Sequence, residues 1–432
     1  MKKRQKLGLK KSSKNIIGII GVGYVGLPLA VKFSDHFNTI CYDNDKIRVN
    51  ELIKGYDRNL NFKSNSLSKK KLRFTYDHNI LKKCNVFIIT LPTPVDKNNL
   101  PDLKMVKDAT LKISNILKIN DFIIFESTFY PGTVDNILIP ILEKNSSLKY
   151  DRDFHVGYSP ERINPGDKKH KLENIKKIVS SNSIIGKKKI KYLYKKIITA
   201  GLFEVSSIKA AELSKILENS QRFVNIALVN QISTLCNKMN IQTKEVIDAA
   251  ASKWNFMKFY PGLVGGHCVA VDPLYLSYIQ NSLGLSSSLI SVAHKINNGK
   301  TNEIVKTVLK YKKRDSNKIK ILILGATFKE NCPDFRNSGI LKIIKEFNKL
   351  KIIPDLHDPY IINKKDKIFF EYKFNQISKL KSSKYNIILV GVGHEMYKKL
   401  GINNIKKLSI KKNCKIIDLK SIFSKKRVSY QL

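Results

Sequence analysis

The chain has 432 residues, which is enough for two or three domains, and its 42% hydrophobic content supports folded cores and not a disordered chain. The formal charge is +44, but the lysines are spread along the whole chain, which is typical of a solvated surface and argues against a dedicated nucleic-acid-binding arm. The six cysteines form no C-x-x-C pair and no apolar run is long enough to cross a bilayer, so we expect neither a disulfide scaffold nor a membrane span.

The first 205 residues predict one α/β lobe behind a basic tail. Residues 1–14 are expected to be a loose tail; with the apolar stretch 16–31 they imitate a signal peptide, but four glycines and Pro28 interrupt that stretch. Apolar runs of strand length lie at 16–20, 39–42, 86–90, 122–126 and 177–180, with helical patterns between them, for example at 27–35 and 105–117. This alternation predicts a doubly wound α/β lobe over residues 15–205.

The middle of the chain is predicted to be helical, after which the alternation returns. Residues 208–253 carry apolar residues at helical spacing, which predicts a long helix or a helix pair, and another helix is expected at about 273–283. Strand patterns follow at 319–324, 351–356, 386–390 and 415–418, with a helix at 340–350. The predicted fold class is therefore α/β, with a helical central domain over 206–312 joining two doubly wound lobes, the second over 313–432.

A glycine-rich motif follows the first predicted strand directly. Gly21-Val22-Gly23-Tyr24-Val25-Gly26 is G-x-G-x-x-G between a strand and a helix, the Rossmann arrangement that brings a pyrophosphate to a helix N-terminus. Asp43 ends the second strand, where an acid binds the adenosine ribose, so NAD is favoured over NADP. Arg48 complicates this slightly, because a nearby arginine could bind a 2′-phosphate. The expected cofactor contacts here are Gly21, Gly23, Tyr24, Val25, Gly26, Asp43 and Arg48.

Two further segments carry a resemblance to a known family. Gly265-Gly266-His267-Cys268 with Asp272-Pro273, and Ser159-Pro160-Glu161-Arg162, resemble the UDP-glucose/GDP-mannose dehydrogenase family. Ordered blocks extend the likeness over nearly the whole chain: Pro92-Thr93-Pro94, Glu126-Ser127-Thr128, Lys215 with Asn219, and Phe328-Lys329-Glu330-Asn331. The Gly-Gly-His-Cys form is similar to the branch that acts on UDP-N-acetylhexosamines, of the Vi-antigen type.

The resemblance implies NAD-dependent oxidation of the C6 hydroxyl of a UDP-sugar to a carboxylate, with UDP-N-acetylglucosamine favoured, for polysaccharide biosynthesis. It also implies that the first lobe binds NAD and the C-terminal lobe binds UDP. A cytoplasmic homodimer or larger homo-oligomer is expected, with the helical central domain as its core and with no nucleic-acid or membrane partner.

Cys268 is the expected covalent catalyst. Oxidation of an alcohol to an acid takes two hydride transfers, and a thiolate can hold the intermediate aldehyde as a thiohemiacetal that is oxidised to a thioester and then hydrolysed. Asp272-Pro273 has the pattern of an N-cap and first residue of a helix, which predicts that Cys268 lies just ahead of a positive helix end. The other five cysteines are interpreted as small buried side chains.

Further roles follow from the resemblance. Lys215 and Asn219 lie four residues apart on one predicted helix face, which Arg222 continues, and the first two would stabilise negative charge on the sugar oxygen. Asp272, with a water held near Thr128, would accept the proton of the first oxidation; it could also serve merely as a helix cap.

Glu161 resembles the acid/base for thioester hydrolysis, if burial raises its pKa; the alternative interpretation is an ion pair with Arg162. His267 is an alternative base by chemistry, although the resemblance makes it a branch marker that shapes the sugar pocket. No His, Cys and Asp cluster has metal-ligand spacing, so no metal site is predicted.

The remaining expected contacts complete two sets. The cofactor set also includes Thr93, Thr128 and Arg336, the last as a cofactor or interdomain contact. The substrate set comprises Arg162, Lys215, Asn219, Arg222, Gly265, His267, Phe328 and Lys329.

Alternatives stay open at this point. A UDP-glucose or GDP-mannose 6-dehydrogenase would use the same residues with a different pocket, and the sequence does not choose between the GlcNAc and GalNAc epimers. A non-catalytic nucleic-acid-binding protein on this scaffold is a remote alternative motivated by the charge, and the intact set of expected catalytic residues argues against it.

Overall fold

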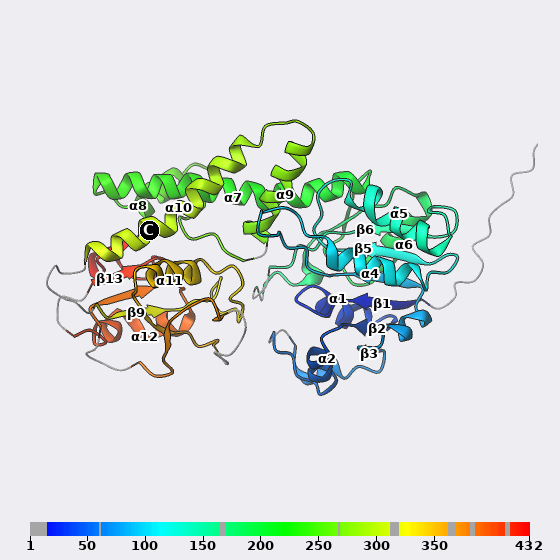
Figure 1. Ribbon diagram of the computed structural model, residues 1–432, viewed down its shortest axis with the longest axis horizontal. Helices are drawn as coiled ribbons and strands as arrows, with labels where there is room; N and C mark the ends of the chain where they lie inside the picture. The colour runs from blue at the N-terminus through cyan, green and yellow to red at the C-terminus, as the bar shows by residue number, and fades with distance from the viewer. Residues whose placement is uncertain are drawn as a thin grey trace, which may run out of the picture. The chain divides into compact units, whose positions relative to one another are not determined.

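The computed structural model describes residues 15–59, 62–164, 167, 169–266, 268–311, 319–361, 369–380, 385–410 and 415–432. The chain divides into two compact units, the first ending at Ile216 and the second beginning at Leu217, and the long helix α7 runs through the division (Figure 1). Each unit contains one six-stranded sheet.

The first unit is built on a sheet in the order β3-β2-β1-β4-β5-β6, in which all neighbours are parallel. The strands are β1 (Ile16–Ile20), β2 (Asn38–Tyr42), β3 (Leu72–Thr75), β4 (Val86–Ile89), β5 (Phe122–Phe125) and β6 (His155–Tyr158). The helices are α1 (Gly26–Phe33), α2 (Lys46–Ile53), α3 (Ser64–Leu67), α4 (Lys104–Ser114), α5 (Ile139–Ser146) and α6 (Ile184–Lys195), with shorter turns η1 (His78–Lys83), η2 (Val134–Leu138) and η3 (Leu172–Asn174). The central strands β4 and β5 are buried at every residue, as expected for parallel strands covered on both faces.

One predicted strand lies outside this sheet. β7 (Lys177–Val179) pairs in parallel with β8 (Leu202–Glu204) in a separate two-stranded sheet. An antiparallel bridge between Tyr158 and Ser180 connects the end of β7 to the end of β6. The loop after β6 therefore runs close to β7.

The middle of the chain consists of α7 (Ile208–Met239), α8 (Thr243–Ala250), α9 (Cys268–Ser282) and α10 (Ser288–Lys310). The predicted helix or helix pair at 208–253 is a pair, because Asn240 adopts a left-handed φ of 58° directly after α7 and ends it. α10 was not predicted, since Asn297, Lys300 and Thr301 are buried on it and interrupt its apolar pattern.

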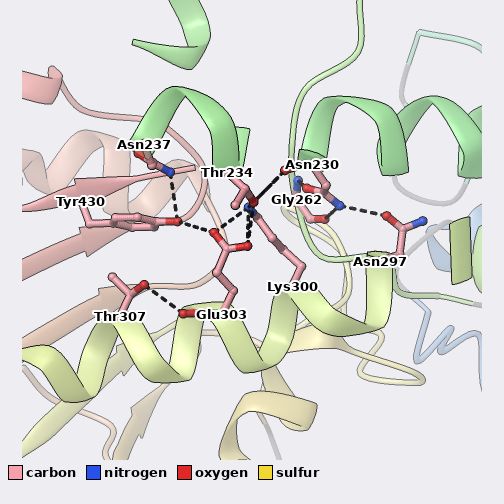
Figure 2. Close-up of polar contacts among 9 residues, drawn as sticks. All are labelled: Asn230, Thr234, Asn237, Gly262, Asn297, Lys300, Glu303, Thr307 and Tyr430. Carbon is pink, nitrogen blue, oxygen red and sulfur yellow. Dashed lines mark hydrogen bonds and ion pairs between the residues drawn. The ribbon is translucent and has the colours of Figure 1, made fainter. Parts of the chain in front are cut away.

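Buried polar side chains join α7 to α10 and to the loop before α9, as Figure 2 shows. Asn230 accepts the N–H of Gly262 at 2.9 Å and donates to its carbonyl at 3.0 Å, so its amide pairs with the backbone as a strand would. The same amide donates to Asn297 at 2.9 Å. Lys300 donates to the Asn230 carbonyl at 3.3 Å and to Glu303 at 3.0 Å. These bonds fix the backbone at Gly262, which leads into α9.

The second sheet has the order β11-β10-β9-β12-β13-β14 and is also parallel throughout. Its strands are β9 (Ile321–Leu324), β10 (Asp355–His357), β11 (Asn375–Gln376), β12 (Ile387–Val390), β13 (Lys415–Asp418) and β14 (Tyr430–Gln431); its helices are α11 (Gly339–Lys349), α12 (Glu395–Lys406) and the short η5 (Lys425–Arg427). β10 begins later than the predicted 351–356, because Lys351 has a φ of 58° and Pro354 has no N–H to pair.

Both sheets thus have the strand order of a doubly wound Rossmann fold, and the predicted fold class is confirmed. In such sheets ligands bind at the carboxyl ends of the strands where the strand order reverses, here beside β1 and β4 and beside β9 and β12. The domain limits at 205 and 312 stay a prediction. Within the described ranges, no helix has the length and apolar character that a bilayer crossing requires.

Candidate active site

The turn between β1 and α1 has the geometry that the glycine motif predicts. Gly21 has a φ of 95°, and its N–H donates to the Tyr42 carbonyl at 2.9 Å. A Cβ on Gly26 would lie 1.9 Å from the Gly21 carbonyl oxygen, so only glycine fits. A Cβ on Gly23 would meet nothing within 4 Å, which leaves the backbone open to a ligand. The cradle that a pyrophosphate needs is therefore present.

Asp43 and Arg48 both serve this turn. The Asp43 carboxylate accepts the N–H of Val22 at 2.9 Å. Arg48 is buried; it donates to the Val22 carbonyl at 3.2 Å and pairs with the buried Asp57 at 2.8 Å. The Arg48 guanidinium thus braces the turn from inside the fold. Its expected contact with the cofactor stays a prediction.

An apolar cavity of about 140 Å³ opens at the carboxyl ends of β1 and β2 in the first unit. The cavity is lined by the apolar side chains of Leu81, Leu91 and Met105. Gly21 and Asp43 line it as well. A mainly apolar cavity beside a carboxylate suits an aromatic base with an attached ribose.

The second lobe repeats the turn of the first. Gly325 directly follows β9 and has a φ of 86°, and its N–H donates to the carbonyl that ends β10 at 2.8 Å. Asp358 follows β10 and accepts the N–H of Ala326 at 2.6 Å, as Asp43 does in the first lobe. Both lobes therefore carry the same carboxylate-braced turn at the point where strand order reverses.

The loop after β5 carries Thr128 and is held from two sides. The Thr93 hydroxyl donates to the Thr128 carbonyl at 2.8 Å. Glu212, buried on α7, accepts the N–H of Gly132 at 2.6 Å and that of Val134, the first residue of η2, at 3.0 Å. Burial raises the pKa of Glu212 to about 8. Glu212 precedes Lys215 by less than one helical turn, so the helix segment that carries Lys215 also holds the Thr128 loop.

Glu161 is buried, and its carboxylate has three donors. One oxygen accepts the backbone N–H groups of Arg162 at 2.5 Å and of Ile163 at 2.6 Å, and the other accepts from Lys177 at 3.1 Å. The side chain of Arg162 instead donates to the Lys176 carbonyl at 3.0 Å. Glu161 therefore forms an ion pair, as considered from the sequence, but its partner is Lys177. The bridge between the ends of β6 and β7 brings Lys177 to Glu161.

A second acid lies behind this pair. Lys177 donates to Glu126 at 2.6 Å, and Tyr194 on α6 donates to the other oxygen of Glu126. All three side chains are buried. Burial raises the pKa of Glu126 to about 7 although Lys177 opposes the shift, and the carboxylates of Glu126 and Glu161 raise the pKa of Lys177 against the effect of burial.

Cys268 is exposed and is the first residue of α9. The expectation that Asp272-Pro273 starts the helix is wrong: both residues are buried inside α9, and Pro273 lies within its second turn. Gly266, with a φ of 78°, precedes α9, which begins five residues earlier than predicted. Cys268 still lies at the helix N-terminus, where the free N–H groups favour a thiolate.

The glycines before Cys268 are in close contact with the loop after β9. A Cβ on Gly265 would lie 2.8 Å from the Asn337 carbonyl oxygen, and one on Gly266 would lie 2.9 Å from the Phe328 ring. The Asn337 amide also donates to the Gly266 carbonyl at 3.3 Å. The structure thus brings Gly265 and Phe328, both expected substrate contacts, to one place in the second unit. His267 lies outside the described residues.

Asn219 and Asp272 meet in the second unit. The Asn219 amide donates to the Asp272 carboxylate at 2.6 Å, and both side chains are buried. Arg222 donates to the Asn219 side-chain oxygen at 2.6 Å, so Arg222, Asn219 and Asp272 form one hydrogen-bonded chain. Lys215 is buried on the same helix.

Two further predicted contacts, Arg336 and Lys329, lie in the C-terminal lobe. Arg336 binds the nearby Asp334 through three side-chain contacts of 2.6–3.1 Å. Its expected role as a cofactor or interdomain contact stays a prediction. Lys329 lies on the loop after β9, where the Thr327 hydroxyl donates to its carbonyl at 2.8 Å.

A buried histidine organises that loop. His394 accepts the N–H of Asn331 on Nδ1 at 3.0 Å, so its proton resides on Nε2, which lies 3.2 Å from both Asp358 and the Thr327 hydroxyl. The loop with Phe328 and Lys329 is therefore tied to the turn after β12.

Comparisons with known proteins follow the same outline. Residues 15–198 match the NAD binding domain of the UDP-glucose/GDP-mannose dehydrogenase family, residues 209–299 its central domain, and residues 322–425 its UDP binding domain. The chain belongs to the UDP-glucose/GDP-mannose dehydrogenase family. It is an NAD-dependent nucleotide-sugar dehydrogenase, as predicted, and the UDP binding domain supports a UDP-sugar as substrate.

Individual relatives cover nearly the whole chain. The chain is 42% identical to the UDP-N-acetyl-D-glucosamine 6-dehydrogenase of Salmonella typhi, over 90% of this chain and 92% of that protein. It is 40% identical to the enzyme of the same name from Pseudomonas aeruginosa, over 96% and 99%. Among solved structures, the UDP-D-ManNAc dehydrogenase of Pyrococcus horikoshii aligns with a TM-score of 0.84 at 26% identity, over 96% of this chain and 98% of that one.

Four buried side chains of this family member were missed as site residues from sequence: Glu126, Lys177, Glu212 and His394. Glu126 belongs to the Glu126-Ser127-Thr128 block, whose resemblance implies a role for Thr128 alone. Nothing in the spacing of the other three distinguishes them from ordinary surface residues, because their partners are distant in sequence and come together only in the fold.

Proposed function

We propose that the chain oxidises the C6 hydroxyl of UDP-N-acetylglucosamine to the carboxylate, in two NAD-dependent steps with Cys268 as covalent catalyst. Support comes from the two relatives of that name at 42% and 40% identity. The observation that carries the covalent mechanism is the position of Cys268, exposed at the first residue of α9.

The other described cysteines are unsuited to this role. Cys41, Cys84, Cys236 and Cys332 are buried. Burial raises the pKa of Cys84 to about 12, and it raises that of Cys41 further. A thiol in such surroundings does not ionise near neutral pH, whereas a thiolate at Cys268 is stabilised by the N-terminal N–H groups of α9.

In the first oxidation the C6 hydroxyl gives up its proton and C6 gives up a hydride, for which bound NAD would supply the acceptor. We assign the proton to a water shared by Thr128 and Asp272. The Asn219 amide, 2.6 Å from Asp272, keeps that carboxylate oriented. Lys215 supplies positive charge to the developing alkoxide.

In the second oxidation the Cys268 thiolate adds to the aldehyde carbon, and Lys215 and Asn219 stabilise the oxyanion of the thiohemiacetal. Loss of the second hydride leaves a thioester on Cys268. Water then attacks the thioester carbon, Glu161 accepts a proton from that water, and the carbon–sulfur bond breaks to return the thiolate. One alcohol, one water and two NAD⁺ would yield one carboxylate, two NADH and three protons.

Binding roles complete the assignment. The cofactor contacts are Gly21, Gly23, Tyr24, Val25, Gly26, Asp43, Thr93 and Thr128, with Arg48 bracing the turn. The substrate contacts are Arg162, Arg222, Gly265, Phe328 and Lys329, and His267 is assigned from sequence alone.

A homodimer is the assembly that we propose. Large apolar side chains at 217, 228, 235 and 239 recur at intervals of three, two and one helical turns and are all 52–60% exposed, so they form one apolar face of α7. A second copy of the chain would cover this face. A cytoplasmic role in polysaccharide synthesis is proposed with it, in keeping with an exposed catalytic thiol that forms no disulfide.

The test is NADH formation by the purified chain with UDP-N-acetylglucosamine, followed by absorbance, beside a Cys268→Ala variant. We expect two NADH per sugar consumed, and loss of that activity in the variant. Circular dichroism and NAD binding confirm that the variant is folded. One NADH per sugar, or unchanged turnover in the variant, would contradict the covalent mechanism.

The substrate has competing candidates. The UDP-N-acetyl-D-mannosamine dehydrogenase of Methanocaldococcus jannaschii is 30% identical over 96% of this chain, so UDP-N-acetylmannosamine is measured in parallel. UDP-N-acetylgalactosamine, UDP-glucose and GDP-mannose complete the panel. A higher kcat/KM for any of these than for UDP-N-acetylglucosamine would overturn the proposed substrate and leave the family unchanged.

A further inference from the structure

We propose that Lys177 is a positioning residue for Glu161: its ammonium holds the carboxylate that accepts the proton of water during thioester hydrolysis. This inference rests on the hydrolytic role of Glu161 in the proposed function. It adds a residue from β7, which neither the sequence motifs nor the family blocks include.

The geometry leaves Glu161 one orientation. One carboxylate oxygen accepts two backbone N–H groups at 2.5 and 2.6 Å, and the other is 3.1 Å from the Lys177 ammonium. Lys177 also donates to the Pro160 carbonyl at 3.2 Å, so it binds the backbone next to Glu161 as well. A rotation of the carboxylate would break at least one of these charge-assisted bonds.

Lys177 is itself fixed from behind. Its ammonium lies 2.6 Å from Glu126, whose second oxygen accepts from the Tyr194 hydroxyl. These groups come from β5, β6, β7 and α6 and their adjoining loops, and Tyr194 and Lys177 are almost completely buried. All three donor sites of the ammonium are used, by Glu126, Glu161 and Pro160, which leaves Lys177 no alternative geometry.

The charge arrangement suits a fixed base better than a stabilising core. Two carboxylates and one lysine are desolvated together, and such clusters are often less stabilising than apolar packing of the same volume. Burial raises the pKa of Glu126 to about 7. As the pH falls towards that value, Glu126, which holds Lys177 in place, takes up a proton. Two backbone N–H groups donate to one oxygen of Glu161 and hold that oxygen in place.

Removal of the ammonium separates hydrolysis from oxidation. In Lys177→Met the two carboxylates lose their shared counter-charge, and Glu161 moves away from it. A base displaced by about 1 Å loses about 10²-fold in the step it serves. Thioester formation on Cys268 does not use Glu161, so we expect the thioester to accumulate and steady-state NADH formation to slow about 10²-fold after an initial burst.

The experiment mixes the full-length enzyme with UDP-N-acetylglucosamine and NAD, quenches in acid, and measures the mass of the intact protein for the Cys268 adduct. Three variants are compared with wild type: Lys177→Met, Lys177→Arg and Glu161→Gln. We expect the adduct on most of the Lys177→Met and Glu161→Gln chains, and on far fewer of the Lys177→Arg chains because the positive charge is kept. If Lys177→Met does not fold, Lys177→Gln replaces it.

Lys300→Met is the matched control for loss of a buried lysine. Lys300 is 2% exposed against 1% for Lys177, and it also binds a glutamate, as Figure 2 shows. We expect this variant to melt at a lower temperature without accumulating the adduct.

The outcomes separate the two proposals. Adduct on Glu161→Gln but not on Lys177→Met would overturn the role of Lys177 and leave the proposed function intact. No adduct on Glu161→Gln would contradict the hydrolytic role of Glu161 itself. Adduct on Lys300→Met to the same extent as on Lys177→Met would mean that general loosening is the cause, and would also overturn the inference.

Discussion

The contact between Asn219 and Asp272 can be tested by placing a second carboxylate in it. Asn219→Asp keeps the shape of the side chain but puts an acid where an amide now donates at 2.6 Å to a buried carboxylate. Two unit charges about 4 Å apart repel by about 4 kcal/mol at the effective dielectric constant of partly buried sites. Arg222, 2.6 Å from the Asn219 oxygen, would offset about 1 kcal/mol of this, because its side chain is 44% exposed and is screened by solvent.

The remaining ~3 kcal/mol sets the size and the pH range of the effect. This energy raises the pKa of the carboxylate pair in the folded variant about two units above the value of about 3.9 for an unfolded aspartate. Over that pH range the folded variant keeps a proton that the unfolded chain has released. Since the folded state then binds more protons than the unfolded state, stability is lost as the pH rises. We expect the variant to match wild type near pH 4 and to be about 3 kcal/mol less stable above pH ~6.

Urea unfolding at several pH values measures this difference. The control is the double variant Asn219→Asp with Asp272→Asn, which exchanges the amide and the carboxylate and restores a single charge, so its pH dependence should return to that of wild type. A single variant that follows the wild-type pH profile, or a double variant that keeps the loss, would refute the contact on which the assignment of Asp272 depends.

Three further predictions concern the two lobes. Asp43→Asn removes the charge that repels a 2′-phosphate, so the ratio of kcat/KM for NADP to that for NAD should rise about 10²-fold; an unchanged ratio would remove Asp43 from the cofactor site. Burial raises the pKa of Glu212 to about 8, so wild-type stability should fall as the pH rises from about 4 to 8, and Glu212→Gln should reduce that slope in urea unfolding; equal slopes would show that Glu212 does not hold the proton. His394→Ala frees the loop of Lys329, so KM for the UDP-sugar should rise about tenfold while KM for NAD stays constant in steady-state assays; a parallel rise of both would indicate general damage.

The sequence predicts most of an element when periodicity and burial agree. β1 and β13 have the predicted bounds because each is a short apolar run, bounded on one side by glycine or aspartate. β6 was missed because His155 and Gly157 dilute its apolar character, although all four of its residues are buried. α10 was missed because the polar residues buried on it satisfy one another through partners on α7 that no local pattern contains.

The start of α9 marks another limit of local patterns. Asp-Pro is a common way to begin a helix, and Asp272-Pro273 was interpreted so. The helix begins at Cys268 because the left-handed turn at Gly266 already directs the chain into it, and the missing N–H of Pro273 costs one hydrogen bond inside the helix. The carboxylate of Asp272 is thereby released from capping and binds Asn219 instead.

The lysine content of this chain explains why the hydrolytic site was only half predicted. With 79 basic residues, a lysine at any given place carries almost no information, and Lys177 is indistinguishable in sequence from the lysines around it. The structure adds what the composition does not contain, which is the burial of each lysine. An exposed lysine keeps its hydration, whereas Lys177 and Lys300 are buried, lose the free energy of hydration, and each require a carboxylate partner. The net charge of +44 therefore describes mainly the surface, while Lys177 and Lys300 mark two places where the fold buries a lysine beside an acid. At Lys177 that acid is the one expected to activate water.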